Sequence, residues 1–195
     1  MNILAINGSP HRRGHGARII QAILKPAADA GLKTELVHLY DKRISGCAAC
    51  NHCKRAKQIS CAVKDDMPAL YRKIMAADAV IVSSPVYMGQ VAGPFKTFLD
   101  RWYAFLDAKF QVRNLPGKKL VVVVTSGAPA GTYSDVARYL KRWMGDFLKM
   151  APAAVIQAGG LKPGSYLDPK VLAKAEKVGR WLAGLPSKRR ALDEA

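Results

Sequence analysis

The stretch DAVIVSSPVY, residues 78–87, decides the fold class of this 195-residue chain. From Ala79 to Val82 it is apolar at every position, whereas a strand with one face in water alternates apolar and polar residues. A continuously apolar strand is buried on both faces, as happens when helices cover both sides of a parallel sheet. The stretch then runs into Ser83-Ser84-Pro85, which predicts a loop at the carboxyl end of the strand.

Four more segments are predicted to be strands, and helical segments separate them. The strands are expected at 2–7 (NILAIN), at 34–40 (TELVHLY), at the start of 118–132 (KKLVVVVTSGAPAGT) and at 153–159 (AAVIQAG). Helical spacing of apolar residues, or an acidic start, predicts helices near 17–30, 65–77, 94–106, 133–150 and 168–184. Pro26 is expected to kink or shorten the first helix. This alternation predicts an α/β fold, a doubly wound five-stranded parallel sheet with helices on both faces.

The chain contains no internal repeat and no linker that would divide it. We therefore expect one domain over residues 1–184, with a cysteine-containing loop, 47–61, inserted after the second strand. Residues 185–195 (LPSKRRALDEA) are expected to form a mobile tail.

The charge of the chain is strongly positive, with 31 Lys and Arg against 14 Asp and Glu, a formal net charge of +17. Such an excess favours anionic partners, but no aromatic-interleaved basic stripe or nucleic-acid motif is present, so nucleic acid is not the expected partner. No apolar run reaches the roughly 20 residues that span a bilayer, and the first residues lack the features of a secretory signal. We expect a cytoplasmic protein without membrane association and with reduced thiols.

Three loops are predicted to meet at one edge of the sheet, because ligands of such sheets bind outside the carboxyl ends of the strands. The first, NGSPHRRGHGAR (7–18), offers glycines for tight curvature, the Ser9 hydroxyl, and the amides of about His15 to Arg18 at a helix N-terminus, where a phosphate is favoured. The loop matches neither the dinucleotide-binding pattern G-x-G-x-x-G nor the G-K-[ST] ending of a loop that binds nucleotide triphosphates. The alternative to an anion-binding loop is a plain turn that only connects the strand to the helix. The basic residues of the loop favour an anion: His11, Arg12, Arg13 and Arg18.

The other two loops suit a flat ligand. In SSPVYMGQVAGP (83–94), Pro85 stiffens the exit from the strand, two glycines allow close approach of the backbone, and Tyr87 and Met88 offer apolar surface. A Tyr and a Met that simply close the core are the alternative for these two side chains. In TSGAPAGTY (125–133), a Ser-Gly pair is small enough to admit a ring edge.

With these loops placed, the chain resembles the flavodoxin-like NADPH-dependent FMN reductase superfamily, and more narrowly its iron-sulfur flavoprotein branch. The resemblance runs through about Gly184 and rests on four motifs in combination. GSPHRRGHG is similar to the phosphate loop GSPR-x-x-G-x-T, and C-x7-CAVKDDM to a cysteine loop followed by DDM. SPVY (84–87) is similar to the flavin loop, and KTFLDRW to a helix with the pattern K-x-F-x-DR.

The resemblance implies a bound FMN. The FMN phosphate would lie on Ser9, His11 and the backbone around His15, Gly16 and Ala17. The isoalloxazine ring would lie against Pro85, Val86, Tyr87, Met88 and Gly89, with its far side near Ser126, Gly127 and Ala128. His11 stands where the family usually has Arg, and Gly16 where it usually has Thr, so FMN affinity below the typical value is expected.

The resemblance also implies an assembly. Members of the family form dimers or tetramers that bury the flavin at a subunit interface, so a homodimer or homotetramer is expected here. The aromatic helix around Trp102 is expected to contribute to that interface.

All four cysteines lie in CAACNHCKRAKQISC (47–61), spaced C-x2-C-x2-C-x7-C. Four thiolates are the ligand set of a cubane iron-sulfur cluster, and three of them at x2 spacing can wrap three corners from one loop. In the branch that the chain resembles, such a loop carries a [4Fe-4S] cluster, which implies Cys47, Cys50, Cys53 and Cys61 as ligands. A zinc site, a disulfide or switch pair, and four unligated thiols stay open as alternatives.

The sequence and the resemblance together predict an FMN-dependent oxidoreductase or electron-transfer flavoprotein. It would move electrons between NAD(P)H or a reduced donor and a small-molecule or redox-protein acceptor, with the cluster as a further carrier where one is present. The flavin would carry the chemistry, so no side chain is expected to be catalytic. The alternatives are a cluster-free NAD(P)H-dependent FMN or quinone reductase and a non-enzymatic electron carrier.

Overall fold

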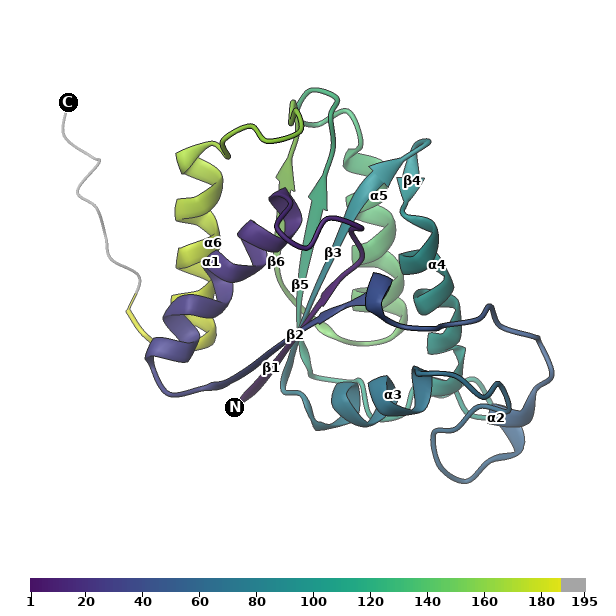
Figure 1. Cartoon of the computed structure of the whole chain (residues 1–195). Coiled ribbons are helices and arrows are strands. Elements are labelled where there is room, and N and C mark those ends of the chain that lie inside the picture. Colours follow the sequence, from purple (N-terminus) through teal and green to yellow (C-terminus); the bar gives the residue numbers. More distant parts are fainter. Residues whose placement is uncertain (187–195) are drawn as a thin grey trace.

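The sheet at the centre of the molecule has the strand order β2-β1-β3-β5-β6, and every pairing along this path is parallel (Figure 1). The structure is a computed structural model that describes residues 1–186. The strands are β1 (Asn2–Asn7), β2 (Lys33–His38), β3 (Ala79–Tyr87), β4 (Gln90–Val91), β5 (Lys119–Thr125) and β6 (Ala151–Ala158). This order is that of a doubly wound, flavodoxin-like sheet, which confirms the predicted fold class.

The strand β4 is an addition to the five predicted strands. It pairs antiparallel with the end of β3, Val86 opposite Val91 and Tyr87 opposite Gln90. Met88 and Gly89 connect the two strands, and both have positive φ angles, 49° and 77°. Two such residues make the tight turn whose twist matches that of a hairpin.

Helices cover both faces of the sheet, as predicted. They are α1 (His15–Asp29), α2 (His52–Arg55), α3 (Met67–Ala76), α4 (Gly93–Asp100), α5 (Ser134–Leu140) and α6 (Pro169–Leu182). α1 and α6 pack on one face, and α3, α4 and α5 on the other (Figure 1). Alternate residues of β3 enter the two cores, Ala79 and Ile81 on the α1 side and Val80 and Val82 on the opposite side. This is why the strand is apolar at every position.

Two predicted helices change their geometry part-way. The segment 94–106 forms α4 and then a 3₁₀ helix, η2 (Arg101–Phe105), and 133–150 forms α5 and then a π-helix, η3 (Lys141–Phe147). In η3 the backbone of Gly145 lies against β6, because a Cβ there would be 2.8 Å from Pro152 Cγ. The second predicted strand ends at His38, and a 3₁₀ turn, η1 (Leu39–Asp41), follows it.

Pro26 does not shorten α1, which runs on to Asp29. The helix is supported by α6, since Gly179 of α6 has no side chain and lies directly against Ile23 and Pro26. Any Cβ at Gly179 would overlap the carbonyl oxygen of Ile23. Packing between α1 and α6 therefore outweighs the missing backbone donor of the proline.

The aromatic residues of α4 and η2 are buried in the core rather than exposed: Phe95, Phe98, Trp102 and Phe105. Trp102 is 2% exposed and makes edge contacts with Phe98 and Phe105. The predicted contribution of this helix to a subunit interface therefore cannot come from its buried aromatic rings, which are used within the chain's own core.

The two edge strands differ in character from the inner ones. In β2 the side chains of Lys33 and Glu35 are exposed. β6 pairs with β5 through Pro152 opposite Leu120 and Ala154 opposite Val121. Ala153 of β6 is therefore an extra residue, which makes a bulge. A bulge and a proline are both typical of edge strands.

The end of the chain continues from α6 without a further element among the described residues. Leu185 and Pro186 are tied to the helix by hydrogen bonds with Arg180. The rest of the predicted tail, 187–195, lies outside the described residues. Within residues 1–186, no helix combines the length and the apolar character needed to cross a bilayer.

Candidate functional site

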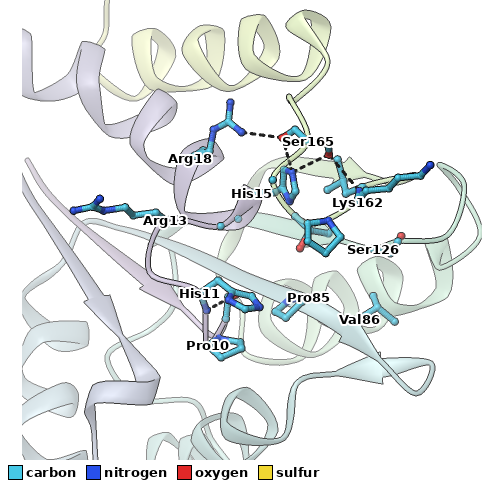
Figure 2. Close-up of a pocket in the computed structure, with 18 of the residues that line it drawn as sticks. Pro10, His11, Arg13, His15, Arg18, Pro85, Val86, Ser126, Lys162 and Ser165 are labelled. Carbon is cyan, nitrogen blue, oxygen red and sulfur yellow. Dashed lines mark hydrogen bonds between the residues drawn. The ribbon is translucent and has the colours of Figure 1, made fainter.

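A cavity of about 670 Å³ opens at the carboxyl edge of the sheet, where the loops after β1, β3, β5 and β6 meet (Figure 2). This volume lies in the range of small-molecule and cofactor sites. The strand order reverses between β1 and β3, so the cavity sits at the position where such sheets bind ligands. Its lining comes from 9–16 and Arg18, from 85–87, from 125–127 and from 161–165.

The loop between β1 and α1 is held by its own hydrogen bonds. The Ser9 N–H donates to Oδ1 of the buried Asn7 at 3.2 Å. Ser9 Oγ accepts from the His11 N–H, and the His11 carbonyl accepts from the Gly14 N–H, each at 3.1 Å. α1 begins at His15, and no side chain caps its first turn. The free amides and the helix dipole therefore favour an anion at this point.

Gly16 lets the start of α1 lie directly on β3. A Cβ at this position would be 2.6 Å from Ser83 Oγ, closer than real side chains approach. Ser83 is fully buried, and its hydroxyl has no hydrogen-bond partner among the described residues. Ser83 does not line the cavity, so the glycine at position 16 serves the close packing of α1 on β3.

The charged side chains at the cavity are all basic. They are Arg12, Arg13, Arg18 and Lys162, and among the described residues no Asp or Glu lines the cavity. Arg12 is paired with Asp41 outside the cavity, at 2.6 Å between Nη2 and Oδ1. The remaining cations, Arg13, Arg18 and Lys162, give the site a net positive potential, which attracts an anionic ligand.

The loop after β6 closes the cavity on the side of α1 (Figure 2). His15 Nε2 lies 2.9 Å from the Ser165 carbonyl oxygen, and Arg18 Nη1 donates to the same oxygen at 3.2 Å. A tight turn between Lys162 and Ser165 shapes the loop. Two basic side chains of α1 thus fix the position of this wall.

The opposite walls are apolar or small. Ser84 Oγ donates to the Pro85 carbonyl at 2.8 Å and accepts from the Ala92 N–H at 2.9 Å, which fixes the exit from β3. Figure 2 shows Pro85 beside His11 and Val86 further along the same strand, and both line the cavity. Burial raises the pKa of Tyr87, so its hydroxyl is neutral at physiological pH. Between these walls there is room for a flat, largely apolar group.

All four thiols of the cysteine loop are free. Cys47 and Cys50 are exposed, whereas Cys53 and Cys61 are half-buried and pack against the core on the α3 side. Burial raises the pKa of Cys53. Within residues 1–186, no group of three or more His, Cys, Asp or Glu side chains is arranged to hold a metal ion. The loop lies at the end of α4 away from the β3–β4 hairpin, and none of residues 47–61 lines the cavity (Figure 1).

Comparison with known families agrees with this geometry. The family model described as NADPH-dependent FMN reductase matches residues 1–159. The chain belongs to this family. It is therefore an oxidoreductase of the FMN reductase type, from a family that binds FMN.

Two proteins that are similar to this chain are named iron-sulfur flavoproteins. One, from Archaeoglobus fulgidus, is 31% identical over 183 residues, which cover 94% of this chain and 79% of the relative. The other, from Methanosarcina thermophila, is 33% identical over 144 residues, 74% of this chain and 73% of the relative. Both alignments cover most of each chain.

Solved structures support the fold of the FMN reductase family member. An NAD(P)H:quinone oxidoreductase from Methanothermobacter marburgensis superposes with a TM-score of 0.74 at 20% identity, over 93% of this chain and 98% of that one. An NADH:FMN oxidoreductase in its apo form superposes with a TM-score of 0.66 at 19% identity, over 96% of this chain and 91% of that one. At such identities the likeness concerns the fold alone.

Most of the residues that sequence reasoning assigned to the flavin site meet at the cavity of this family member. Those that line it are Ser9, His11, His15, Gly16, Pro85, Val86, Tyr87, Ser126 and Gly127. Four do not: Ala17, Met88, Gly89 and Ala128. Ala17 is buried within α1, and the Met88 side chain is fully exposed at the tip of the hairpin.

Sequence reasoning missed the loop 161–165. The sequence carries a signal for it, because Gly160 and Pro163-Gly164 follow a predicted strand, as the small residues of the other three loops do. In the structure Leu161 N–H donates to the Ser126 carbonyl, which joins this loop to the one after β5. The rule that ligands bind at strand carboxyl ends applies to all four loops.

Proposed function

We propose that this FMN reductase family member binds FMN in the cavity at the carboxyl edge of the sheet and transfers electrons from NAD(P)H to a small-molecule or redox-protein acceptor. The phosphate would lie at the start of α1 and the ring between Pro85–Tyr87 and Ser126–Gly127. The observation that carries the proposal is the uncapped start of α1 in a cavity whose charged lining is entirely basic.

Bound FMN supplies hydride and single-electron chemistry, and the chain supplies binding and orientation. The amides after Gly14 would hold the phosphate, with Arg13 adding positive charge nearby and the His11 ring adding a polar contact. Pro85 and Val86 would support one side of the ring, while the small Ser126-Gly127 pair leaves space for its edge. The structure assigns no proton transfer to a side chain.

The binding test compares FMN with riboflavin, which has the same ring and no phosphate. We expect the apo protein to bind FMN far more tightly than riboflavin, by about 100-fold or more, since charge-assisted contacts go to the phosphate. Arg13→Gln should weaken FMN binding by about fivefold and leave riboflavin binding unchanged. Arg138→Gln, an exposed arginine on α5, is the matched control. Equal affinity for FMN and riboflavin would place the phosphate elsewhere.

The electron donor is tested on the FMN-loaded protein without oxygen. NADH and NADPH are mixed with it separately, and the loss of oxidised flavin absorbance is followed. Reduction by one or both supports the proposed donor. If neither reduces the flavin while FMN remains bound, the proposal that NAD(P)H is the donor is wrong.

A second candidate function adds a [4Fe-4S] cluster on Cys47, Cys50, Cys53 and Cys61. It is favoured by the chemistry of the donor set, four free thiols on one loop, and by the names of the two relatives. In this structure the four thiols do not form a metal-holding group, so binding would have to draw the exposed pair toward the half-buried pair.

Anaerobic purification with assays for iron, sulfide and zinc tests this candidate. About four iron and four sulfide per chain, lost in Cys53→Ser, would support the cluster. Zinc at about one per chain would assign a zinc site instead. No metal in protein that has bound FMN would leave a cluster-free FMN reductase.

The expected homodimer or homotetramer is also a proposal. It is supported by an aromatic row on α5 and η3, in which the exposed Trp143 packs against the exposed Phe147 and the half-buried Tyr139. Sedimentation of Trp143→Asp tests it. A sedimentation coefficient equal to that of an associated wild-type protein would exclude this surface.

A further inference from the structure

The cysteine loop is attached to the segment that follows α4 by an arginine. Arg113 comes directly after the isolated bridge between Leu106 and Val112, and its guanidinium turns toward the loop. Nη2 donates to the Cys53 carbonyl at 3.2 Å and to the Ala104 carbonyl at 2.9 Å. Nη1 donates to the Ala56 carbonyl at 3.2 Å. One side chain thus joins Cys53 of α2 and its C-cap, Ala56, to η2.

Lys54 makes the reciprocal connection. It lies on α2, and its Nζ donates to the carbonyls of Tyr103 and Leu106, each at 2.8 Å. The same ammonium lies 3.5 Å from the centre of the Tyr103 ring, a cation–π contact. We call the contacts of Arg113 and Lys54 the α2 anchor. Both cations use main-chain carbonyls, so the anchor fixes the backbone of the loop.

The α2 anchor holds only one half of the loop. Cys53 lies within it, and Cys53 and Cys61 are half-buried against the core. Residues 45–51, which carry Cys47 and Cys50, are all exposed. Their one side-chain contact with α2 is from Arg55 Nη2 to the Cys50 carbonyl, at 3.4 Å. The four thiols are therefore divided into a half-buried pair, of which Cys53 is held by the anchor, and an exposed pair.

We propose that Arg113 is the positioning residue of the cysteine loop, which holds Cys53 in place so that a thiolate-binding metal or cluster meets a preformed half-site. The inference rests on the proposed role of the four thiols as a ligand set. A preformed half lowers the ordering cost of binding, and the open half can then close over the ligand. Arginine suits this task, because its two Nη atoms, held in a planar fork, reach carbonyls on both sides at once, whereas the donors of a lysine all lie on one nitrogen.

Thiol alkylation of the metal-free, FMN-loaded protein tests the inference without any cluster. Each cysteine is followed separately by mass spectrometry during reaction with iodoacetamide. Arg113→Lys keeps the charge but loses the fork. It should raise the alkylation rate of Cys53 about tenfold, because the loop around Cys53 opens more easily. The alkylation rate of Cys47 should stay unchanged. Arg55→Lys is the matched control on the same loop, and it should leave the ratio of the two rates at its wild-type value.

Two results would overturn the proposal. An unchanged Cys53 rate in Arg113→Lys would mean that the guanidinium does not position the loop. An equal rise at all four thiols, together with a lower melting temperature, would mean that Arg113 only stabilises the fold. Lys54→Gln disrupts the anchor from the other side, so a selective rise at Cys53 is expected there too, even if the Arg113 variant does not fold.

Iron uptake separates this inference from the proposed function. After anaerobic reconstitution, Arg113→Lys should hold several-fold less iron than Arg55→Lys, at equal FMN content. Equal iron in the two variants would contradict the half-site. If the wild-type protein takes up no iron, the cluster proposal fails, and the alkylation ratio alone decides the role of Arg113.

Discussion

The contact between Gly16 and Ser83 determines which residues the start of α1 can accept. Replacing a helical glycine by alanine normally stabilises a protein by about 0.5–1 kcal/mol. Here the added methyl group would lie 2.6 Å from Ser83 Oγ, so the opposite sign is expected. The serine hydroxyl is buried without a partner among the described residues, and its removal relieves both problems at once.

Gly16→Ala is therefore expected to lower the free energy of unfolding by about 1–3 kcal/mol, the usual cost of overpacking. Ser83→Ala alone should be neutral or slightly stabilising. The double variant should recover most of the loss, because the clash needs both groups. Urea unfolding of the four proteins measures this coupling. Simple addition of the two single effects would show that the residues do not interact.

The ion pair between Arg101 and Asp65 closes the base of the cysteine loop. Both side chains are buried, 0% and 4% exposed, and Arg101 Nη1 also donates to the Ser45 carbonyl at 2.7 Å. Burial acts to raise the pKa of Asp65. The hydrogen bonds from Arg101, Ser45 and Met67 outweigh it, and the pKa is lowered from its ordinary value. The pair therefore joins the two ends of the loop through a carboxylate that is held ionised.

Asp65→Asn leaves the guanidinium buried without a counter-charge and should cost about 3–5 kcal/mol at pH 7. Because the folded-state pKa is lowered, the contribution of Asp65 is complete above its unfolded pKa of about 4 and is lost as pH falls through the folded value. The gap in stability between wild type and Asp65→Asn should therefore narrow below about pH 4. Urea unfolding from pH 7 to pH 3 measures it. A gap that is constant with pH would mean that Asp65 does not titrate with folding.

At the scale of elements, the sequence predicts what depends on local pattern and misses what depends on distant contacts. The five parallel strands and the principal helices follow from apolar runs and spacing. The change to a 3₁₀ helix at Arg101 does not, because that side chain is fixed by Ser45 and Asp65, far away in sequence. The π-helix is similar, since Gly145 meets Pro152 only in the folded molecule.

The candidate site likewise contains residues that local motifs predict and residues that only the folded structure brings together. The β1–α1 loop and the SPVY loop carry motifs and could be placed from the sequence. Ser83 could not, because only the pairing of β1 with β3 brings it beneath Gly16. Met88 has the soft apolar side chain that a flavin contact favours, but the hairpin turn directs it into solvent.

The packing of α1 on α6 depends on Gly179. Gly179→Ala is expected to destabilise the protein by about 2–3 kcal/mol, since the new methyl group meets the Ile23 carbonyl oxygen and the helices must separate. Ala173→Gly, at an exposed position of α6, should cost only about 1 kcal/mol from helix propensity. Thermal unfolding compares the two. A smaller loss in Gly179→Ala than in Ala173→Gly would contradict the close helix contact.

At the scale of the whole molecule, the net charge of +17 works against folding and in favour of anion binding. Added sodium chloride screens both effects. We therefore expect the urea midpoint to rise between low and moderate salt, while FMN affinity falls several-fold and riboflavin affinity stays constant. Parallel titrations at two salt concentrations test this. A salt-independent FMN affinity would mean that the basic lining does not contact the phosphate.

The irregular edges of the sheet bear on how copies of the chain can meet. Exposed strand edges are templates for uncontrolled aggregation, in which a strand of one molecule extends the sheet of the next. Lys33 and Glu35 on β2, and Pro152 with its neighbouring bulge on β6, make both edges poor templates. Both edges of the native sheet are thereby made unfavourable for fibril-like growth, which leaves the helices and loops as the better surfaces for ordered assembly.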